Sequence, residues 1–262
     1  VVGGGHAGCE AAHAAAVMGS KTLLITMDMT KLAQMSCNPA MGGIAKGQIV
    51  REIDALGGMS GVVTDRSMIQ FRMLNRSKGP AMWSPRAQCD RQKFTTEWRK
   101  ILEHTESLYI WQEPAKAVLT EYNKVKGIET EFGTRFMASA VILTNGTFLN
   151  GLMHVGFSRM TGGRSGDRSS KGLSNQLAEL GFSVERMKTG TSARIDGRSV
   201  DFSLMTEQKG DNEGRSFSYL GQPVNIAEQK SCFITHTNEE AHEELRKGLK
   251  FSPLFTGRIK GR

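Results

Sequence analysis

Two short stretches of the chain combine residue types and spacing that could do chemistry. GGGHAG, at Gly3–Gly8, places three glycines in the pattern G-x-G-x-x-G, which is typical of a turn that holds the pyrophosphate of a dinucleotide. MSCNPAMGGIAKG, at Met35–Gly47, places Cys37 beside an Asn-Pro turn, with glycines and a lysine after it. A deprotonated thiol is a nucleophile. The two stretches therefore suggest a dinucleotide-binding site and a reactive cysteine.

The glycine pattern stands in the context that its function requires. It follows two apolar residues and opens an alanine-rich helix, after which Lys21–Thr26 is predicted to be a strand. Gly3 would permit the tight turn, Gly5 the close approach of a pyrophosphate, and Gly8 the packing of helix on strand. The helix N-terminus would then face the phosphates. Asp28 lies at the distance along the chain where an acidic residue could bind the ribose of the dinucleotide. The alternative is that Asp28 is a solvated loop residue without a ligand.

Cys37 is the cysteine whose surroundings favour a functional thiol. Its loop is rich in Asn, Pro and Gly and lies just upstream of a helix predicted over Lys46–Leu56. Ser36, Asn38 and Lys46 supply hydrogen-bond donors and charge. Helix N-termini and nearby cations stabilise a thiolate. We therefore expect Cys37 to have a functional role.

The other cysteines are expected to be structural. Cys9 lies inside the first helix, Cys89 precedes a predicted helix, and Cys232 lies in the apolar strand SCFIT. The four cysteines make no CxxC pair and no metal-ligand spacing, and the six histidines form no HExxH, so neither a disulfide framework nor a zinc site is expected. A reducing cytoplasm is the predicted compartment. No apolar stretch approaches the roughly 18 residues that span a bilayer, so no membrane association is expected.

Positive charge is concentrated in two segments. The chain has 34 basic and 26 acidic residues, a net charge of +8. Arg66–Lys100 holds nine basic residues against two acids, and Arg159–Arg198 holds eight against four. Such segments favour a polyanion such as nucleic acid, and Trp83 and Phe94 could stack on bases. The alternatives are a generally basic surface, or arginines that pair with flavin phosphates or with acids elsewhere.

The remaining pattern predicts mixed helix and strand. Helices are expected over Gln92–His104, Ser174–Leu180 and Asn238–Leu249, and strands over Tyr109–Thr120, Lys126–Thr130 and Arg135–Thr144, with a hairpin around Asn123-Lys124. The end of the last strand, Ala138–Thr144, is apolar and predicted to be buried. Asn145-Gly146-Thr147 follows it directly, as a second close approach of backbone to a dinucleotide would require.

This order suggests an α/β fold. The predicted fold is a Rossmann-like FAD-binding domain of the glutathione-reductase type with an inserted, strand-rich second domain. Residues 1–190 are interpreted as the N-terminal part of the FAD-binding domain, and residues 191–262 as the start of the inserted NADH or substrate domain. Both ends of the chain interrupt an element or a loop, so it is interpreted as the N-terminal part of a longer protein, without the C-terminal remainder.

A set of motifs along the whole chain resembles one family. The motifs are GGGHAGCEAA, MSCNPAMGGIAKG, REIDALGG, IQFRMLNRSKGPA, TNGTFLNG, GGRSGD, KTGTSARID, GDN and CFITHTN. Together they resemble the FAD-containing subunit of the tRNA uridine 5-carboxymethylaminomethyl modification enzyme, the MnmG or GidA family. The resemblance implies a cytoplasmic enzyme that uses FAD, NADH and methylene-tetrahydrofolate to build an aminomethyl-type group on C5 of the wobble uridine of tRNA. It also implies a homodimer that joins a partner GTPase of the MnmE type in a heterotetramer.

The same resemblance implies roles for individual residues. Cys37 matches the first of two important cysteines, and the second, in a Pro-Arg-Tyr-Cys-Pro motif, lies outside this chain, so the fragment alone is expected to be inactive. The residues implied to bind the FAD diphosphate are Gly3, Gly4, Gly5, His6, Ala7 and Gly8. Those implied to contact the cofactor elsewhere are Ala115, Gly146, Thr147 and Ser170. The sequence departs from the family's pattern at Ser192-Ala193, where many relatives have a Pro-Pro pair, and Asp28 stands where the family is variable.

Three other functions compete with this interpretation. A folate- and FAD-dependent tRNA uridine C5-methyltransferase would share the glycine turn, but the SCNPA loop is not expected there. A pyridine-nucleotide disulfide oxidoreductase would need a redox pair of cysteines, which the sequence lacks. A tRNA-binding module with a vestigial flavin site would keep the basic segments and lose the cofactor.

Overall fold

The computed structural model describes residues 1–213, 215–221 and 229–259. The chain divides into two compact units. The first comprises Val1–Pro114, Ala140–Asn145 and Glu207–Cys232, and the second comprises Ala115–Ser139, Gly146–Thr206 and Phe233–Arg262. The domain boundary proposed near residue 190 stays a prediction.

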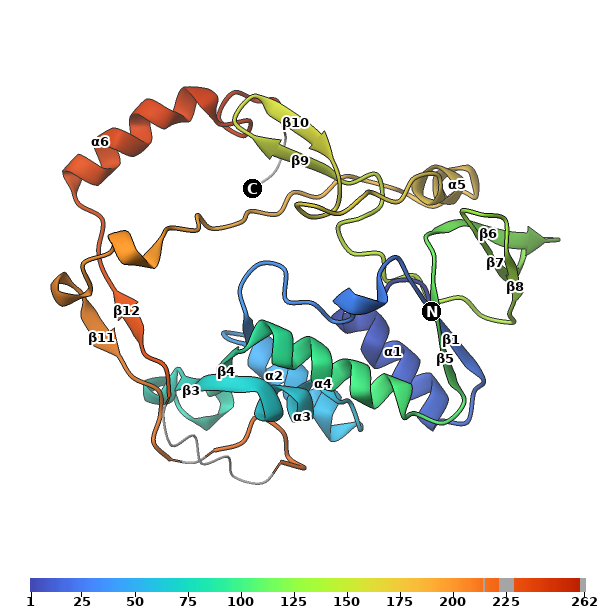
Figure 1. Cartoon of the computed structure of the whole chain (residues 1–262), viewed down its shortest axis with the longest axis horizontal. Coiled ribbons are helices and arrows are strands. Elements are labelled where there is room, and N and C mark those ends of the chain that lie inside the picture. Colours follow the sequence, from blue (N-terminus) through green and yellow to red (C-terminus); the bar gives the residue numbers. More distant parts are fainter. Residues whose placement is uncertain (214, 222–228, 260–262) are drawn as a thin grey trace. The chain divides into compact units, whose positions relative to one another are not determined.

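The first unit contains a parallel sheet. β1 (Thr22–Thr26) pairs in parallel with β5 (Leu108–Gln112), and Val2 bridges in parallel to β1 on one side and to Leu143 on the other. The order across the sheet is therefore β5, β1, Val2 and Leu143, which is the 3-2-1-4 order of a doubly wound dinucleotide-binding sheet. Figure 1 shows β1 and β5 side by side next to α1 (His6–Val17). The predicted Rossmann-like α/β class is confirmed.

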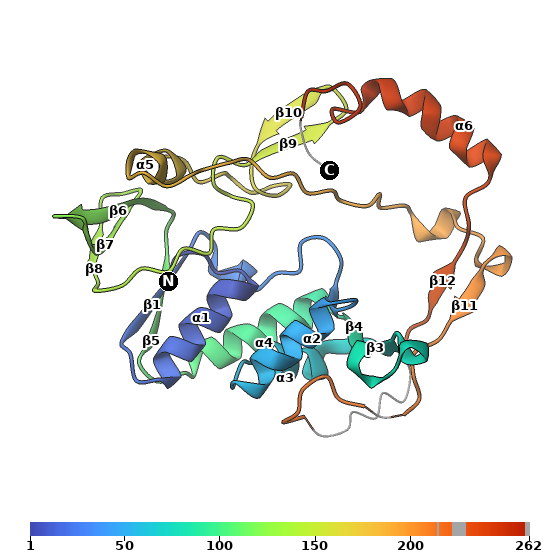
Figure 2. The same cartoon turned by 180° about the vertical axis from the view of Figure 1, so that it is seen from behind.

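Two helices of this unit bury one face each. α1 buries Gly8, Cys9, Ala12 and Ala16. α4 (Arg91–Glu103) buries Phe94, Trp98 and Leu102. Spacings of three and four residues place these side chains along one stripe of each helix. The two helices lie beside one another in the opposite views of Figure 1 and Figure 2, and together they supply much of the core.

The helix ends follow from local sequence. The Asp90 carboxylate caps α4 by accepting hydrogen bonds from the backbone N–H groups of Gln92 and Lys93, both at 2.9 Å. α2 (Lys46–Ala55) is followed by Gly57, whose φ of 94° favours glycine. α2 and α4 confirm the two helices predicted for this part of the chain.

An antiparallel sheet, which we did not predict, completes the first unit. Its order is β2 (Ala40–Gly42), β4 (Ser84–Cys89) and β3 (Met68–Leu74), and α3 (Ser60–Ser67) leads into β3. Apolar and polar residues alternate over part of β3, and this is the signal that could have revealed the strand. The buried side chains of the sheet join the core cluster of the unit, among them Met41, Phe71, Met73 and Ala87.

The second unit contains a three-stranded meander. β6 (Ala115–Glu121), β7 (Lys124–Thr130) and β8 (Arg135–Met137) are antiparallel neighbours in that order. Tyr122 and Asn123 both have positive φ between β6 and β7, as a type I′ turn requires. The hairpin predicted at this position is confirmed.

The other elements of the chain are short. α5 (Leu173–Glu179) lies against β6, and β9 (Leu152–Val155) pairs with β10 (Ser158–Thr161). β11 (Thr206–Gln208) pairs with β12 (Cys232–Ile234), and α6 (Glu239–Gly248) begins at Asn238. α5 and α6 confirm the predicted helices near these positions. Within the described ranges, no helix combines the length and the apolar character needed to cross a bilayer.

Two strand predictions are wrong. Tyr109–Thr120 is not one strand, because Glu113 donates its N–H to Thr26 at the end of β1 and Pro114 has no N–H to continue a ladder. Ala138–Thr144 is neither a strand nor buried: only Leu143 bridges to Val2, and Ile142 is 44% exposed. In a parallel pairing the residues before Leu143 lie opposite those before Val2, and only Val1 stands there in this sequence, so the bridge to Leu143 is not continued into a strand.

Candidate functional site

The glycine turn is closely packed at two of its three glycines. Gly3 has a φ of 111°, and a Cβ there would lie 2.5 Å from the carbonyl oxygen of Thr144. A Cβ at Gly8 would lie 1.7 Å from the carbonyl oxygen of Gly3. The Thr144 hydroxyl donates to the carbonyls of Val2 and Gly3, at 2.9 and 3.0 Å. The turn thus requires glycine at Gly3 and Gly8 for reasons of folding alone.

Gly5 differs from its neighbours because the space beside it is open. In the described chain no atom lies within 4 Å of the position that a Cβ of Gly5 would take, and no side chain caps α1 there. The first N–H groups of a helix lack intrahelical partners, and they attract anions together with the helix dipole. The first turn of α1 contains no acidic residue. This end of α1 therefore has the room and the electrostatics that a pyrophosphate needs.

His6 connects the glycine turn to the cysteine loop. Its Nε2 lies 2.9 Å from the carbonyl oxygen of Ala33, and Ala33 donates its own N–H to Gly4 at 2.8 Å. Since a carbonyl oxygen only accepts, Nε2 carries the proton in this contact. Burial lowers the pKa of His6 and favours the neutral ring. Ala33 is fully buried and has a φ of 51°, which is in the left-handed region. Its hydrogen bonds to His6 and Gly4 hold it in that conformation.

The cysteine loop is anchored again farther along. Arg91, at the start of α4, donates to the carbonyl oxygen of Cys37 at 2.6 Å. Cys89 donates its backbone N–H to the carbonyl of Pro39, also at 2.6 Å. Cys37 itself is partly exposed. The loop therefore presents Cys37 at the surface between two fixed points, and Lys46 opens α2 downstream as predicted.

The other cysteines differ in burial. Cys9 and Cys89 are buried, and desolvation raises the pKa of each thiol to about 12. Such thiols stay protonated at neutral pH, which supports the structural role predicted for both. Cys232 is partly exposed in β12, and its thiol donates to the side-chain oxygen of Gln70 at 3.4 Å.

The remaining residues implied to contact the cofactor lie in the second unit. Ala115 begins β6, and Ser170 donates its hydroxyl to the Ala115 carbonyl at 3.2 Å, so the structure brings these two together. Thr147 donates its hydroxyl to the carbonyl of Gly163 at 2.8 Å. Gly146 has a φ of 58°, a conformation that favours glycine. The glycine turn (Gly3–Gly8) and the loop that carries Cys37 belong to the first unit.

Asp28 has local partners that favour the loop alternative over a ribose ligand. Its carboxylate accepts from the backbone N–H and the hydroxyl of Thr30, at 2.8 and 2.6 Å, and pairs with Lys31 at 3.2 Å. The Thr30 hydrogen bond is the largest cause of the lowered pKa of Asp28. The carboxylate thereby begins the short helix Met29–Lys31.

Several cations of the basic segments are paired with acids, which is one of the alternatives that the sequence left open. Arg76 contacts Asp211 at 2.9 Å and Glu213 at 2.6 Å. Other pairs are Arg66 and Lys100 with Glu97, Arg99 with Glu103, Arg164 with Asp167, and Arg198 with Asp196. The proposal that Phe94 stacks on bases is wrong, because the ring is fully buried in the core.

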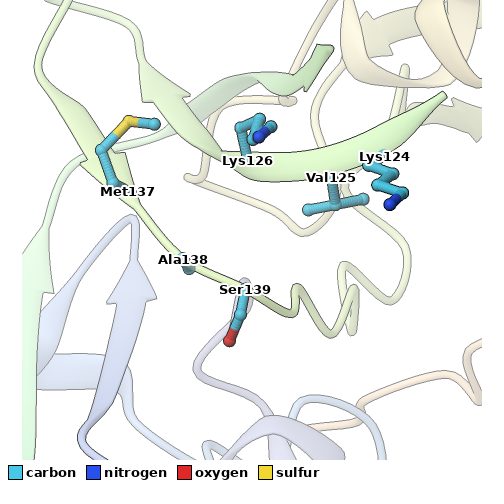
Figure 3. Close-up of a pocket in the computed structure, with 6 residues that line it drawn as sticks. All are labelled: Lys124, Val125, Lys126, Met137, Ala138 and Ser139. Carbon is cyan, nitrogen blue, oxygen red and sulfur yellow. The ribbon is translucent and has the colours of Figure 1, made fainter. Parts of the chain in front are cut away.

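An open pocket of about 690 Å³ lies elsewhere in the second unit (Figure 3). Its lining residues come from the start of β7, from the last residue of β8 and from the two residues after β8. They are Lys124, Val125, Lys126, Met137, Ala138 and Ser139. None of these is a predicted site residue, and Lys126 already pairs with Glu121 at 3.1 Å. The pocket therefore adds nothing to the candidate site.

Known proteins share this sequence and this fold. Residues 1–262 match the family described as glucose inhibited division protein A. The tRNA uridine 5-carboxymethylaminomethyl modification enzyme MnmG of Cytophaga hutchinsonii is 59% identical over 100% of this chain and 42% of its own length. The enzyme of the same name from Parabacteroides distasonis is 60% identical over 99% of this chain and 42% of its own.

A solved structure agrees with the sequence relatives. GidA of Aquifex aeolicus, in its form I crystal, has a TM-score of 0.93 at 45% identity and covers 99% of this chain and 45% of that chain. The chain thus spans less than half of the length of these relatives. Because the family match extends over every residue and the fold agrees, the chain belongs to the glucose inhibited division protein A family.

Proposed function

We propose that this chain is the part of an FAD-dependent tRNA-modifying enzyme that binds the flavin and presents a nucleophilic cysteine. The whole protein would build a (carboxymethyl)aminomethyl group on C5 of the wobble uridine of tRNA. One observation carries the proposal: the turn that leaves open space for a pyrophosphate at Gly5 also holds the loop of Cys37, through Gly4 and His6. The names of the relatives supply the reaction class.

The residues present fit FAD. The N-terminal N–H groups of α1 and the open space at Gly5 suit its pyrophosphate, so Gly3–Gly8 would hold that part of the cofactor. Ala115, Gly146, Thr147 and Ser170 are proposed to contact it elsewhere. FAD would supply redox chemistry and one-carbon transfer, with NADH as reductant and methylene-tetrahydrofolate as carbon donor.

Cys37 is proposed to act on the uracil ring. Its thiolate sulfur would bond to C6, and the electron pair of the C5–C6 double bond would move to C5, which becomes nucleophilic. After C5 has bonded to the one-carbon unit and lost its proton, the C6–S bond would break and release the thiolate. Arg91 and His6 would fix the loop through its backbone and leave the thiol accessible.

The proposed partners follow from the same function. The partner macromolecule is tRNA, and the family resemblance adds an MnmE-type GTPase and a homodimer within a heterotetramer, in the cytoplasm. The basic segments support tRNA binding only through the cations that ion pairs leave available, such as the exposed Lys78.

The test is Cys37→Ser in the full-length protein, with Cys232→Ser as the matched control at the other partly exposed cysteine. A serine hydroxyl without an adjacent base is a poor nucleophile at neutral pH, so we expect about a 100-fold or greater loss of wobble-uridine modification. Flavin content, melting temperature and tRNA affinity should stay near those of the wild type, and Cys232→Ser should stay active. Near-normal modification by Cys37→Ser would remove this thiol from the mechanism. Parallel loss of flavin and stability would make its role structural.

A further inference from the structure

Two arginines face each other across the β3–β4 ladder. Arg72 of β3 and Arg86 of β4 are directly paired in the register, so their side chains project from the same face of the sheet. The opposite face carries Phe71, Met73 and Ala87 and packs into the core. Both arginines are partly exposed, so a ligand can reach them. Figure 1 shows the two strands side by side.

Among the described residues, neither arginine has a carboxylate partner of the kind that Arg76 of the same segment has. Over the part of the chain that the structure describes, no carboxylate lies within ion-pair distance of Arg72 or Arg86, and Arg72 Nε is buried without a hydrogen-bond acceptor. The nearby Asp211 is already engaged by Arg76 at 2.9 Å and by the backbone N–H of Met73 at 2.7 Å. The residues of β2, β3 and β4, all of them described, include no acid.

This arrangement is unfavourable without an anion. Like charges directly opposite each other on a ladder destabilise the pair of strands, and a buried donor without an acceptor loses its hydration. An oxyanion between the two guanidinium groups would offset their repulsion, because a guanidinium group can offer two parallel N–H donors to an oxyanion. We propose that Arg72 and Arg86 form an oxyanion-binding site that takes a phosphate group.

The occupant that the charge pattern favours is a phosphodiester of bound RNA, an assignment that rests on the proposed function. A phosphate of a dinucleotide cofactor has the same chemistry. Measurements of flavin content and NADH affinity distinguish this cofactor phosphate from an RNA phosphate. Inorganic phosphate can test whether Arg72 and Arg86 bind an oxyanion at all, whichever of the two molecules supplies the phosphate group in the working protein.

The first experiment measures the melting temperature of the full-length protein with inorganic phosphate and with chloride at equal ionic strength. Arg86→Gln is compared with wild type and with Lys93→Gln, which removes one exposed charge from α4 in the same segment. Phosphate should raise the melting temperature of wild type and Lys93→Gln, and this response should be lost in Arg86→Gln. In phosphate-free buffer at low salt, Arg86→Gln should melt no lower than wild type, because the repulsion of Arg72 is gone. A full phosphate response in Arg86→Gln would overturn the site.

The second experiment assigns the occupant. If the site holds an RNA phosphate, Arg86→Gln should reduce the slope of log tRNA affinity against log salt by roughly 0.7 to 0.9, with flavin content and NADH affinity unchanged. An unchanged slope overturns the RNA assignment, and a loss of flavin or of NADH affinity would instead identify a cofactor phosphate. If wild type binds no tRNA, the proposed function fails, while the phosphate response still tests the site.

Discussion

At the scale of single residues, the three glycines of the turn are needed for different reasons. Gly3 and Gly8 have no room for a side chain because backbone atoms lie too close, whereas Gly5 has open space beside it. Only the requirement at Gly5 would come from a ligand. The sequence pattern alone treats the three as equivalent members of one motif.

This difference predicts that two substitutions fail in different ways. Gly5→Val should fold with a melting temperature near that of wild type and should lose FAD, because its side chain fills the space that the pyrophosphate would occupy. Gly8→Ala should lower the free energy of unfolding by several kcal/mol or prevent folding, because its Cβ would collide with the Gly3 carbonyl. Flavin absorbance per protein and thermal melting of the full-length variants are the measurements. A folded Gly5→Val protein with full flavin content would contradict the assignment.

At the scale of elements, buried carboxylates hold a distant segment onto α2 and α3. Asp65 of α3 accepts from the backbone N–H groups of Phe217 and Ser218, at 2.5 and 3.0 Å. Asp54 of α2 accepts from the Ser218 hydroxyl at 2.6 Å and from the Tyr219 N–H at 2.7 Å. These contacts join parts of the chain that are more than 150 residues apart, and they explain why two acids are buried in this unit.

Asp65 gives this clamp a pH dependence of defined sign. Desolvation by burial is the largest cause of the raised pKa of Asp65, so the folded protein binds its proton more tightly than the unfolded chain. Its contribution to stability is therefore present below the ordinary value of 3.8 and is lost as pH rises through the raised pKa. The difference in free energy of unfolding between wild type and Asp65→Asn should decrease as pH rises through this range.

Asp28 is the matched control of opposite sign. Hydrogen bonds from Thr30 lower the pKa of Asp28, so its contribution is present above the ordinary value and is lost as pH falls. The stability difference between wild type and Asp28→Asn should thus increase with pH over the acidic range. Equilibrium unfolding of the full-length proteins at a series of pH values measures both differences. Equal slopes for the two variants would show that burial does not control Asp65.

At the scale of the whole molecule, positive charge is less available than its distribution along the sequence suggested. The nine cations of Arg66–Lys100 include Arg76, which Asp211 and Glu213 neutralise from a distant part of the chain. Lys78, two residues later, is exposed, and among the described residues it has no acidic partner. Neighbouring cations in one basic segment therefore have different roles.

Charge reversal should separate these roles. Arg76→Glu should lower the melting temperature, because it removes two ion pairs and places a third negative charge beside two carboxylates. Lys78→Glu should keep the melting temperature and weaken tRNA binding, reducing its salt slope by roughly 0.7 to 0.9 if Lys78 contacts one phosphate. Thermal melting and tRNA titration at several salt concentrations check the pair. An unaltered slope for Lys78→Glu would exclude that contact.

The sequence by itself determined the features that depend on neighbouring residues. The glycine turn, the helix that it opens and the helix capped by Asp90 follow from short patterns, because their hydrogen bonds join residues only a few positions apart. The same local reasoning failed at Ala138–Thr144, where apolar composition predicted a buried strand and the short partner segment could not pair with it.

Only the tertiary structure decided which distant residues meet. The contact of His6 with Ala33, the clamp of Asp65 on Phe217 and the opposition of Arg72 and Arg86 join separate elements or strands. Whether an arginine finds a carboxylate, or an acid is stripped of water, depends on packing that brings such elements together, and no local pattern records it. For that reason the sequence pointed to a cofactor turn and a cysteine loop, while their connection and the paired arginines emerged only from the fold.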